Sequence, residues 1–248
     1  MADTPLISIV TVTFNASSTI RKTMESISAQ SFKNFEHLVI DGASKDDTTE
    51  IIKGFDLPQT EIISEPDRGL YDAMNKALKL AKGKYILFLN AGDAFHDASS
   101  LEKYAREADS NADIIYGDTV IVDLEGNYLG PRHLSVPDQL TFKSFSDGML
   151  VCHQAFMVRK ELADPYDLSY RFSADYDWCV RCIAKSDSAK CKNLNKVTID
   201  YLRDGLTDKN KLKSLKERFI IMSRHYGLIP TILRHFTFLI RSLRRQSL

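Results

Sequence analysis

The type and position of Asp93 in this sequence indicate a residue that could bind a ligand. It ends the polar turn Asn90-Ala91-Gly92-Asp93, which directly follows five large apolar residues, Tyr85 to Leu89. Such an unalternated run is typical of a strand covered on both faces, and open α/β sheets bind ligands at the carboxyl ends of their strands. A carboxylate there can hold a hard cation against a phosphate. The alternative interpretation is that residues 90–93 form only a polar turn.

Three further loops bring small, flexible or acidic residues to the same predicted sheet edge. They contain Asn15, residues 41–47 and residues 67–69. Four such loops at the ends of successive strands predict a shared ligand site. The sequence contains neither GxGxxG nor GxxxxGK followed by Ser or Thr, which disfavours a dinucleotide-dependent dehydrogenase and a P-loop NTPase.

The elements that must position these loops alternate between strand and helix. Strands are predicted at 6–14, 35–40, 60–64 and 85–89, and helices at 19–30, 48–54 and 70–82. This alternation predicts an α/β fold with a mainly parallel, right-handed sheet. The second half mixes helices at 98–108 and 173–185, a hairpin over 119–129, and strands at 156–158 and 196–202. We interpret it as the second half of the same domain.

Length and charge allow one large domain with an appendage. The chain has 248 residues, 44% of them apolar, and 33 basic residues balance 33 acidic ones. From Leu206 to Leu248, however, ten Lys or Arg residues face only Asp208 and Glu217. This asymmetry predicts a basic tail that meets something anionic. A nucleic-acid partner is not expected.

The same tail is predicted to be helical, with a break at Gly227 and Pro230. Between Ile229 and Leu243 the apolar side chains fall within an arc of about 120° at 100° per residue. The arginines on the other side are Arg234, Arg241, Arg244 and Arg245. This pattern predicts a helix in the plane of the anionic inner face of a cell membrane. The alternative is that the apolar face packs on the preceding domain or on a second subunit of a homodimer.

Two other features bear on the compartment. The sequence shows no secretory leader and no apolar stretch of about 18 residues, so we expect a cytoplasmic protein. Cys179 and Cys182 are three residues apart, with no second CxxC and no nearby His pair. We therefore interpret the cysteines as buried thiols rather than as a metal or redox site.

Three stretches together resemble the family 2 glycosyltransferases of the GT-A fold. They are SIVTVTFN at 8–15, VIDGASKDDT at 39–48 and GKYILFLNAGD at 83–93. A fourth stretch, EPDRGLYDAMNK at 65–76, is similar to the branch that acts in O-antigen, capsule and colanic-acid polysaccharide synthesis. The resemblance implies a Rossmann-like, mainly parallel mixed sheet flanked by helices. Its nucleotide-sugar-binding half would span 1–97, its acceptor half 98–205, and a C-terminal helical extension 206–248.

The resemblance also assigns roles by position. The residues expected to contact the nucleotide sugar are Thr13, Phe14, Asn15, Asp41, Arg68, Asp72, Asn75 and Asn90. Asp41 would accept hydrogen bonds from the base or ribose, and Arg68 would neutralise the diphosphate. Asp72 and Asn75 lie three residues apart and can share one helix face. Their alternative interpretations are a solvated helix residue and a packing amide.

One departure from the family concerns the metal. Most members carry Asp-x-Asp-Asp after the central strand, whereas here Asn90 and Gly92 replace the first two carboxylates and only Asp93 remains. A single carboxylate with substrate phosphates still predicts a Mg²⁺ or Mn²⁺ site, because Mg²⁺ often uses one or two carboxylates plus phosphates.

The second half is expected to supply the catalytic base. The stretch SADYDWCVR at 173–181 resembles the family's Glu-Asp-x-Asp-x-x-x-Arg helix start. Asp175 falls on the base position, with Asp177 in reserve, although an acidic residue there can also be a helix N-cap. His153 and Gln154 match a His-Gln pair near the acceptor or diphosphate, but a lone histidine is more often structural.

The resemblance therefore implies an inverting transfer from a nucleotide sugar, expected to be a UDP-sugar, to a saccharide on a polyprenyl diphosphate. The altered acidic motif leaves open a catalytically weak or inactive scaffold protein at the membrane. A nucleotidyltransferase is disfavoured, because residues 15–18 lack its glycine-rich loop with Arg and Lys.

Overall fold

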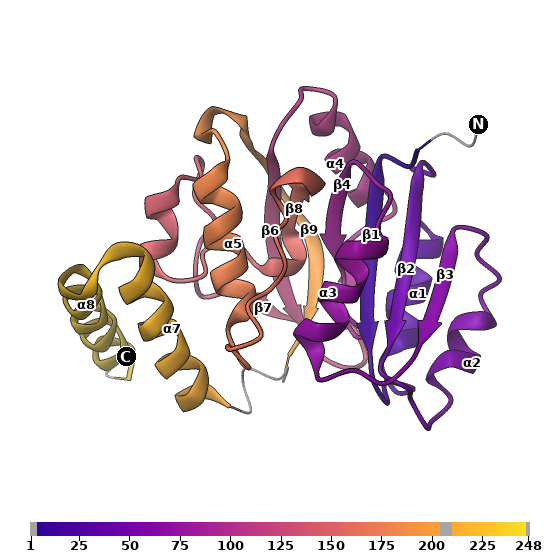
Figure 1. Ribbon diagram of the computed structural model, residues 1–248, viewed down its shortest axis with the longest axis horizontal. Helices are drawn as coiled ribbons and strands as arrows, with labels where there is room; N and C mark the ends of the chain where they lie inside the picture. The colour runs from indigo at the N-terminus through magenta and orange to yellow at the C-terminus, as the bar shows by residue number, and fades with distance from the viewer. Residues whose placement is uncertain (1–3, 204–209, 247–248) are drawn as a thin grey trace.

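A mixed sheet of nine strands crosses the part of the chain that the computed structural model describes, residues 4–203 and 210–246 (Figure 1). The strands are β1 (Ile7–Thr13), β2 (Phe35–Asp41), β3 (Thr60–Ser64), β4 (Tyr85–Phe88), β5 (Ala94–Phe95), β6 (Ile114–Val122), β7 (Tyr128–Pro131), β8 (Phe156–Arg159) and β9 (Cys191–Leu202). Their order across the sheet is β3-β2-β1-β4-β8-β6-β9-β5, and β7 pairs with β6.

The strands of the N-terminal half run parallel, as the strand–helix alternation predicts. β2 lies beside β1 and β3, and β1 lies beside β4, all in parallel pairs. Every residue of β1 is buried, because helices cover both faces of the sheet there. In the register of β1 and β2, Thr13 lies opposite Asp41. The loops that follow these strands therefore begin at the same edge of the sheet.

The second half of the sheet is mixed. β8 runs antiparallel to both β4 and β6, whereas β9 runs parallel to β6. The predicted hairpin is present, formed by β6 and β7. The short strand β5 pairs with the end of β9, with Ala94 opposite Asp200. This pairing brings the end of β9 to the turn that follows β4.

The described residues contain seven α-helices. They are α1 (Ile20–Ser28), α2 (Thr48–Lys53), α3 (Leu70–Leu80), α4 (Ser100–Ala108), α5 (Ala174–Lys185), α7 (Lys211–Tyr226) and α8 (Leu228–Gln246). Helices α3, α5 and α7 contribute to one buried apolar cluster. Helices α1, α2 and α4 contribute to two other clusters. Short 3-10 helices include η1 (Phe142–Asp147) and η2 (His153–Ala155).

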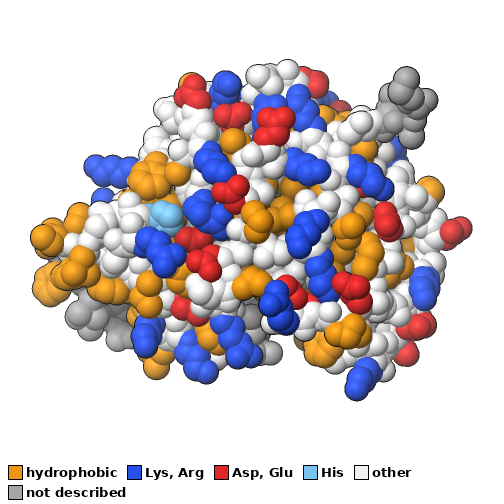
Figure 2. All heavy atoms as spheres, in the orientation of Figure 1, with side chains coloured by type: hydrophobic (Ala, Val, Ile, Leu, Met, Phe, Trp, Pro, Cys, Tyr) orange, Lys and Arg blue, Asp and Glu red, His pale blue; other side chains and the backbone are white. Residues whose placement is uncertain are grey.

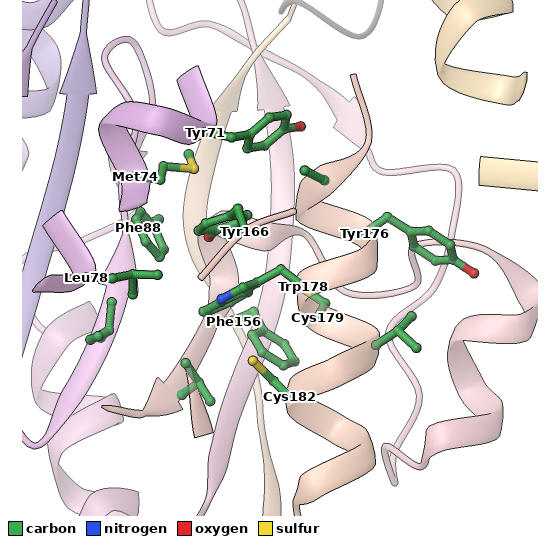
Figure 3. Close-up of a cluster of buried hydrophobic side chains, with 14 of the residues drawn as sticks. Tyr71, Met74, Leu78, Phe88, Phe156, Tyr166, Tyr176, Trp178, Cys179 and Cys182 are labelled. Atoms are coloured by element: carbon green, nitrogen blue, oxygen red, sulfur yellow. The ribbon is translucent and has the colours of Figure 1, made fainter. Parts of the chain in front are cut away.

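An aromatic cluster forms the centre of the core between α3 and α5 (Figure 3). Tyr166 stacks on Trp178 with ring centroids 5.1 Å apart and on Tyr71 at 5.5 Å. Phe88, from the last position of β4, meets the edge of Trp178 at 5.7 Å. The Trp178 Nε1–H donates to the main-chain oxygen of Asp164, so its polar atom is satisfied. This cluster ties the N-terminal half of the fold to α5.

Helix α7 belongs to this core, although the sequence places it in a basic tail. Ile221 and Met222 are buried in the same apolar cluster as α3 and α5. Tyr226 donates to the main-chain oxygen of Phe142 in η1. The predicted start of the tail, residue 206, lies outside the described residues. Of the two predicted breaks, Gly227 ends α7, with φ of +90°, a region that favours glycine.

The second predicted break, at Pro230, is wrong, because this proline lies within a continuous helix. It lies in the first turn of α8, where a residue's N–H has no intrahelical acceptor.

The four cysteines are buried and unpaired, as predicted. Within residues 4–203 and 210–246, no helix combines the length and apolarity that crossing a membrane requires.

Candidate active site

A cavity of about 740 Å³ opens at the carboxyl ends of β1 and β4. Its wall comes from both halves of the fold: the end of β1, the start of α3, the turn after β4, the segments after β7 and before η2, the start of α5, the end of β9, and α7. Seven of the predicted site residues line it, namely Thr13, Phe14, Asn90, Asp93, His153, Gln154 and Asp175.

Asp93 is buried at the base of this cavity and is held by two protein donors. Its Oδ1 accepts from the Leu202 backbone N–H at 3.0 Å, and its Oδ2 accepts from Gln154 Nε2 at 2.9 Å. Burial raises the pKa of Asp93 to about 7, and these hydrogen bonds partly oppose that shift. A nearby cation would stabilise the ionised form of such a carboxylate.

Two buried oxygens in the cavity wall have no hydrogen-bond partner in the structure. They are Asn90 Oδ1, in the turn that contains Asp93, and Thr13 Oγ1, at the end of β1. A buried polar atom without a partner costs free energy, so such atoms indicate a ligand. The Asp93 carboxylate and the Asn90 amide oxygen are hard oxygen donors, which suit Mg²⁺ or Mn²⁺.

The structure also explains the departure at Gly92. Its φ is +103°, and a Cβ atom there would lie 2.7 Å from Leu202 Cδ2. An aspartate at this position would therefore be strained in its backbone and would push the Leu202 side chain aside. No group of three or more His, Cys, Asp or Glu side chains that could hold a metal exists among the described residues. A cation here would need oxygens of the substrate as well.

Asp175 lies in the first turn of α5 and is half-buried in the cavity wall. Its Oδ1 accepts a 3.1 Å hydrogen bond from the Tyr71 hydroxyl. The predicted N-cap role does not describe it, because Ser173 is the cap residue and Asp175 is inside the helix. Its carboxylate is thus oriented toward the cavity by a residue of α3.

His153 and Gln154 line the cavity, but their polar atoms contact protein groups. His153 Nε2 lies 2.6 Å from the Tyr166 hydroxyl, and its ring stacks on Phe88 at 5.0 Å. Burial lowers the pKa of His153 to about 4, so its imidazole is neutral at pH 7. Gln154 binds Asp93. These two residues shape and support the site in this structure.

Asn15 and Asp41 organise the loops beside the cavity instead of lining it. Asn15 adopts φ of +48° and accepts a hydrogen bond from the Lys45 N–H. The buried Asp41 carboxylate accepts from both the N–H and the hydroxyl of Ser44, and from the hydroxyl of Ser64. Their predicted contacts with the nucleotide stay predictions.

Arg68 and Asp72 form an ion pair of 2.9 Å with each other at the start of α3. The Asp72 carboxylate also accepts from the Arg68 backbone N–H, as a capping residue does. Neither side chain lines the cavity, and 78% of the Arg68 side chain is exposed. Arg68 would therefore have to break its ion pair with Asp72 before its guanidinium could bind a diphosphate.

Asn75 and Asp177 bind protein groups in this structure, and their predicted substrate contacts stay predictions. Both polar atoms of the Asn75 side chain bind the backbone of Tyr166, at 3.0 and 2.7 Å. The buried Asp177 carboxylate accepts from Arg181 Nε at 2.7 Å and lies 2.8 Å from His225 Nε2. Neither lines the cavity, because each joins two segments of the fold. Asn75 is the packing amide of the alternative interpretation.

The cavity residues that were not predicted from the sequence include Tyr71, Arg132 and Arg218. Tyr71 lies inside the stretch 65–76 that resembles the family, so its position next to Asp72 could have identified it as a candidate site residue. Arg132 and Arg218 stand in stretches without a motif. Their place in the wall depends on how β7 and α7 pack.

Comparisons with known proteins agree with this architecture. The family model described as "Glycosyl transferase family 2" matches residues 8–166. A curated relative from Mycobacterium tuberculosis, named "PGL/p-HBAD biosynthesis glycosyltransferase", is 32% identical over 224 residues, which are 85% of this chain and 84% of the relative.

Two solved structures show the same fold at low identity. TarS of S. aureus in complex with UDP-GlcNAc has a TM-score of 0.72 and 17% identity, with 94% of this chain and 73% of that chain covered. Glucosyl-3-phosphoglycerate synthase of Mycobacterium tuberculosis, with Mn²⁺ and UDP, has a TM-score of 0.65 and 14% identity, with 90% and 81% covered.

Proposed function

The chain belongs to glycosyl transferase family 2 and has the GT-A fold, and on that basis we propose that it is an inverting transferase that uses a UDP-sugar. The observation that carries the proposal is the position of Asp175 and Asp93. These carboxylates come from opposite halves of the fold and line one cavity. One suits proton transfer, and the other suits a cation beside a diphosphate.

The reaction is a single displacement at the anomeric carbon. The acceptor hydroxyl forms the new glycosidic bond while the bond to the diphosphate breaks, so the configuration inverts. Asp175 accepts the proton of that hydroxyl. The Tyr71 hydrogen bond occupies Oδ1 of the carboxylate and leaves Oδ2 without a partner among the described residues.

The nucleotide sugar is proposed to lie along the β1 side of the cavity. The unpartnered hydroxyl of Thr13 and the ring of Phe14, which is 61% exposed, are available to it there. A divalent cation, Mg²⁺ or Mn²⁺, would neutralise the leaving diphosphate. Asp93 and Asn90 are the residues that would hold it, and Gln154 would keep Asp93 in place.

The proposed acceptor is a saccharide on a polyprenyl diphosphate, in surface polysaccharide synthesis. The PGL/p-HBAD biosynthesis named for the curated relative is a second candidate pathway. A lipid-linked acceptor accounts for the apolar side of α8, which Figure 2 shows as hydrophobic side chains at the left end of the molecule. The exposed residues are Leu228, Ile229, Ile232, Leu233 and Phe236.

We propose that this surface of α8, defined by those five residues, rests on an anionic membrane. One predicted contact requires correction, because Arg234 pairs with Asp147 of η1 and is not directed at lipid. The side chains of Leu239, Ile240, Arg241, Leu243, Arg244 and Arg245 lie outside the described residues. Lys213 and Lys216 on α7 are exposed and can contact anionic headgroups.

A donor panel tests the activity. The purified chain is incubated with UDP-glucose, UDP-galactose, UDP-GlcNAc and GDP-mannose, with Mg²⁺ or Mn²⁺, and nucleotide release is measured with and without short lipid-linked saccharides. We expect release from one UDP-sugar, lost in Asp175→Asn and kept in Asp109→Asn, an exposed carboxylate after α4. Tight UDP binding without turnover across the panel would favour the scaffold alternative.

A further inference from the structure

Two arginines line the cavity without a carboxylate partner among the described residues. They are Arg132, directly after β7, and Arg218, on α7. By contrast, Arg181, Arg224 and Arg234 each pair with a carboxylate within 4 Å. Figure 1 places α7 beside α5 and away from β1. Arg218 therefore belongs to the α5 side of the cavity, whereas Thr13 and Phe14 belong to its β1 side.

Arg132 is held in a fixed orientation by the loop that follows η1. Its guanidinium donates to the main-chain oxygens of Met149, at 3.0 Å, and Leu150, at 3.3 Å. A guanidinium has five N–H donors, so three remain for another acceptor. The positive charge itself is not neutralised by these neutral carbonyl groups.

Arg218 shows a more direct sign of a missing partner. Its Nε is buried and has no hydrogen-bond acceptor in the structure. Its guanidinium lies 5.9 Å from the centroid of the Tyr176 ring, a contact that holds the side chain without using its donors. A buried N–H without an acceptor costs free energy, so a ligand with acceptor oxygens is expected at this point.

We propose that Arg132 and Arg218 form an anion subsite that binds a phosphate of the acceptor substrate. A dianionic phosphate matches two guanidinium groups in charge, and each guanidinium can bind it through two parallel N–H donors. The acceptor is the source we assign, because Arg218 neighbours α5, which carries Asp175. This inference rests on the proposed function.

Calorimetry on the full-length chain saturated with UDP and Mg²⁺ tests the subsite, because the donor site is then filled. The probes are n-octyl phosphate and the uncharged n-octyl glucoside, which share one alkyl chain. We expect the phosphate to bind at least about tenfold more tightly, the effect of one or two charged hydrogen bonds. Arg218→Ala and Arg132→Ala should each remove most of that difference.

The variants of Arg218 separate charge from folding. Arg218→Lys keeps the positive charge and should keep part of the preference for the phosphate. Arg224→Ala is the matched control, since Arg224 lies on the same helix, pairs with Asp167 and does not line the cavity. It should bind both probes like the natural chain. Thermal unfolding by circular dichroism establishes that each variant is folded.

Three results would overturn the proposal. In the first, the natural chain binds the two octyl probes equally. In the second, inorganic phosphate binds as tightly as octyl phosphate, which indicates a site for a free anion. In the third, Arg218→Ala weakens UDP and leaves octyl phosphate unchanged, which assigns the arginine to the donor. Failure of the natural chain to bind UDP at all would instead contradict the proposed function.

Discussion

The hydroxyl of Tyr71, in the first turn of α3, donates a 3.1 Å hydrogen bond to the carboxylate of Asp175, in the first turn of α5. The two residues are 104 positions apart and come from opposite halves of the fold. Tyr71 also stacks on Tyr166, which in turn stacks on Trp178 of α5. The proposed base is therefore held by the same contacts that join the two halves.

Asp175→Asn should lower turnover by about 100-fold or more while UDP binding persists, because an amide cannot accept the proton of the acceptor hydroxyl. Tyr71→Phe should have a smaller effect, since it removes only the orienting hydrogen bond. Turnover and UDP affinity are measured separately, by product formation and by calorimetry. Turnover of Asp175→Asn within about tenfold of the natural chain would exclude Asp175 as the base.

Asp93→Ala should abolish the metal dependence of UDP binding, because Asp93 is the only carboxylate in the turn after β4. Gln154→Ala removes one of the two hydrogen bonds that hold Asp93 and should weaken the metal response without abolishing it. UDP titrations with and without Mn²⁺ measure the response. If Asp93→Ala responds to Mn²⁺ like the natural chain, the metal binds elsewhere.

Glu217→Ala should lower turnover by about tenfold to a hundredfold, because small misplacements of a catalytic group are costly. The Glu217 carboxylate, on α7, accepts from the N–H groups of Arg171 at 2.9 Å and Phe172 at 2.8 Å, just before α5. It therefore fixes the segment that leads into Asp175.

The kinetic split identifies Glu217 as a positioning residue. The turnover number should fall while the KM for the nucleotide sugar stays unchanged, and Glu217→Gln, which keeps one acceptor oxygen, should restore part of the rate. Lys216→Ala, an exposed neighbour, is the control and should match the natural chain. A rise in KM with an unchanged turnover number would contradict the assignment.

We predict that the buried, neutral His37 makes the folded protein sensitive to weak acid. His37 is buried between Thr11 and Thr60, 3.0 Å from each hydroxyl, and burial lowers its pKa to about 3. The unfolded chain, with a histidine pKa near about 6.5, binds the proton first. The contribution of His37 to the free energy of unfolding should therefore fall as the pH drops below 6.5, by up to about 1.4 kcal/mol per pH unit for one proton.

Urea unfolding at pH 7.5, 6.5 and 5.5 measures this dependence. Position 37 cannot titrate in His37→Gln, so acid should destabilise this variant less than the natural chain, and the difference between their free energies of unfolding should change with pH whatever the absolute stabilities. His153, with a pKa lowered to about 4, contributes in the same direction, and Asp93, with a pKa raised to about 7, contributes in the opposite direction. Both residues remain in both proteins. Equal pH slopes in the two proteins would show that His37 does not contribute.

The double substitution of Ile229→Ser with Leu233→Ser should reduce binding to anionic vesicles by at least about tenfold. Burial of two aliphatic side chains in the membrane contributes more free energy than a tenfold change in affinity requires. These side chains are 73% and 64% exposed on α8, so their replacement should not disturb the core. Co-sedimentation measures binding, and UDP affinity reports the fold. Leu124→Ser, 58% exposed in the β6–β7 turn, is the control. A natural chain that never binds vesicles would refute the membrane proposal.

The sequence alone determined the features that depend on local order. The apolar runs and the polar turns after them predicted the parallel strands and the edge at which Thr13, Asn90 and Asp93 meet. Strands of one direction end at one edge, so their loops meet whatever the remaining packing is. The stretch 173–181 also resembled the family's helix start closely enough to single out Asp175, which the structure places in the cavity wall.

Tertiary structure decided the residues whose partners are distant in sequence. Asn75 and Asp177 looked available for substrate, but they bind Tyr166 and His225, and neither pairing leaves a pattern along the chain. Arg132 and Arg218 enter the cavity only because β7 pairs with β6 and α7 packs against α5. A side chain's surroundings depend on long-range packing, whereas periodicity reports only the face on which it lies.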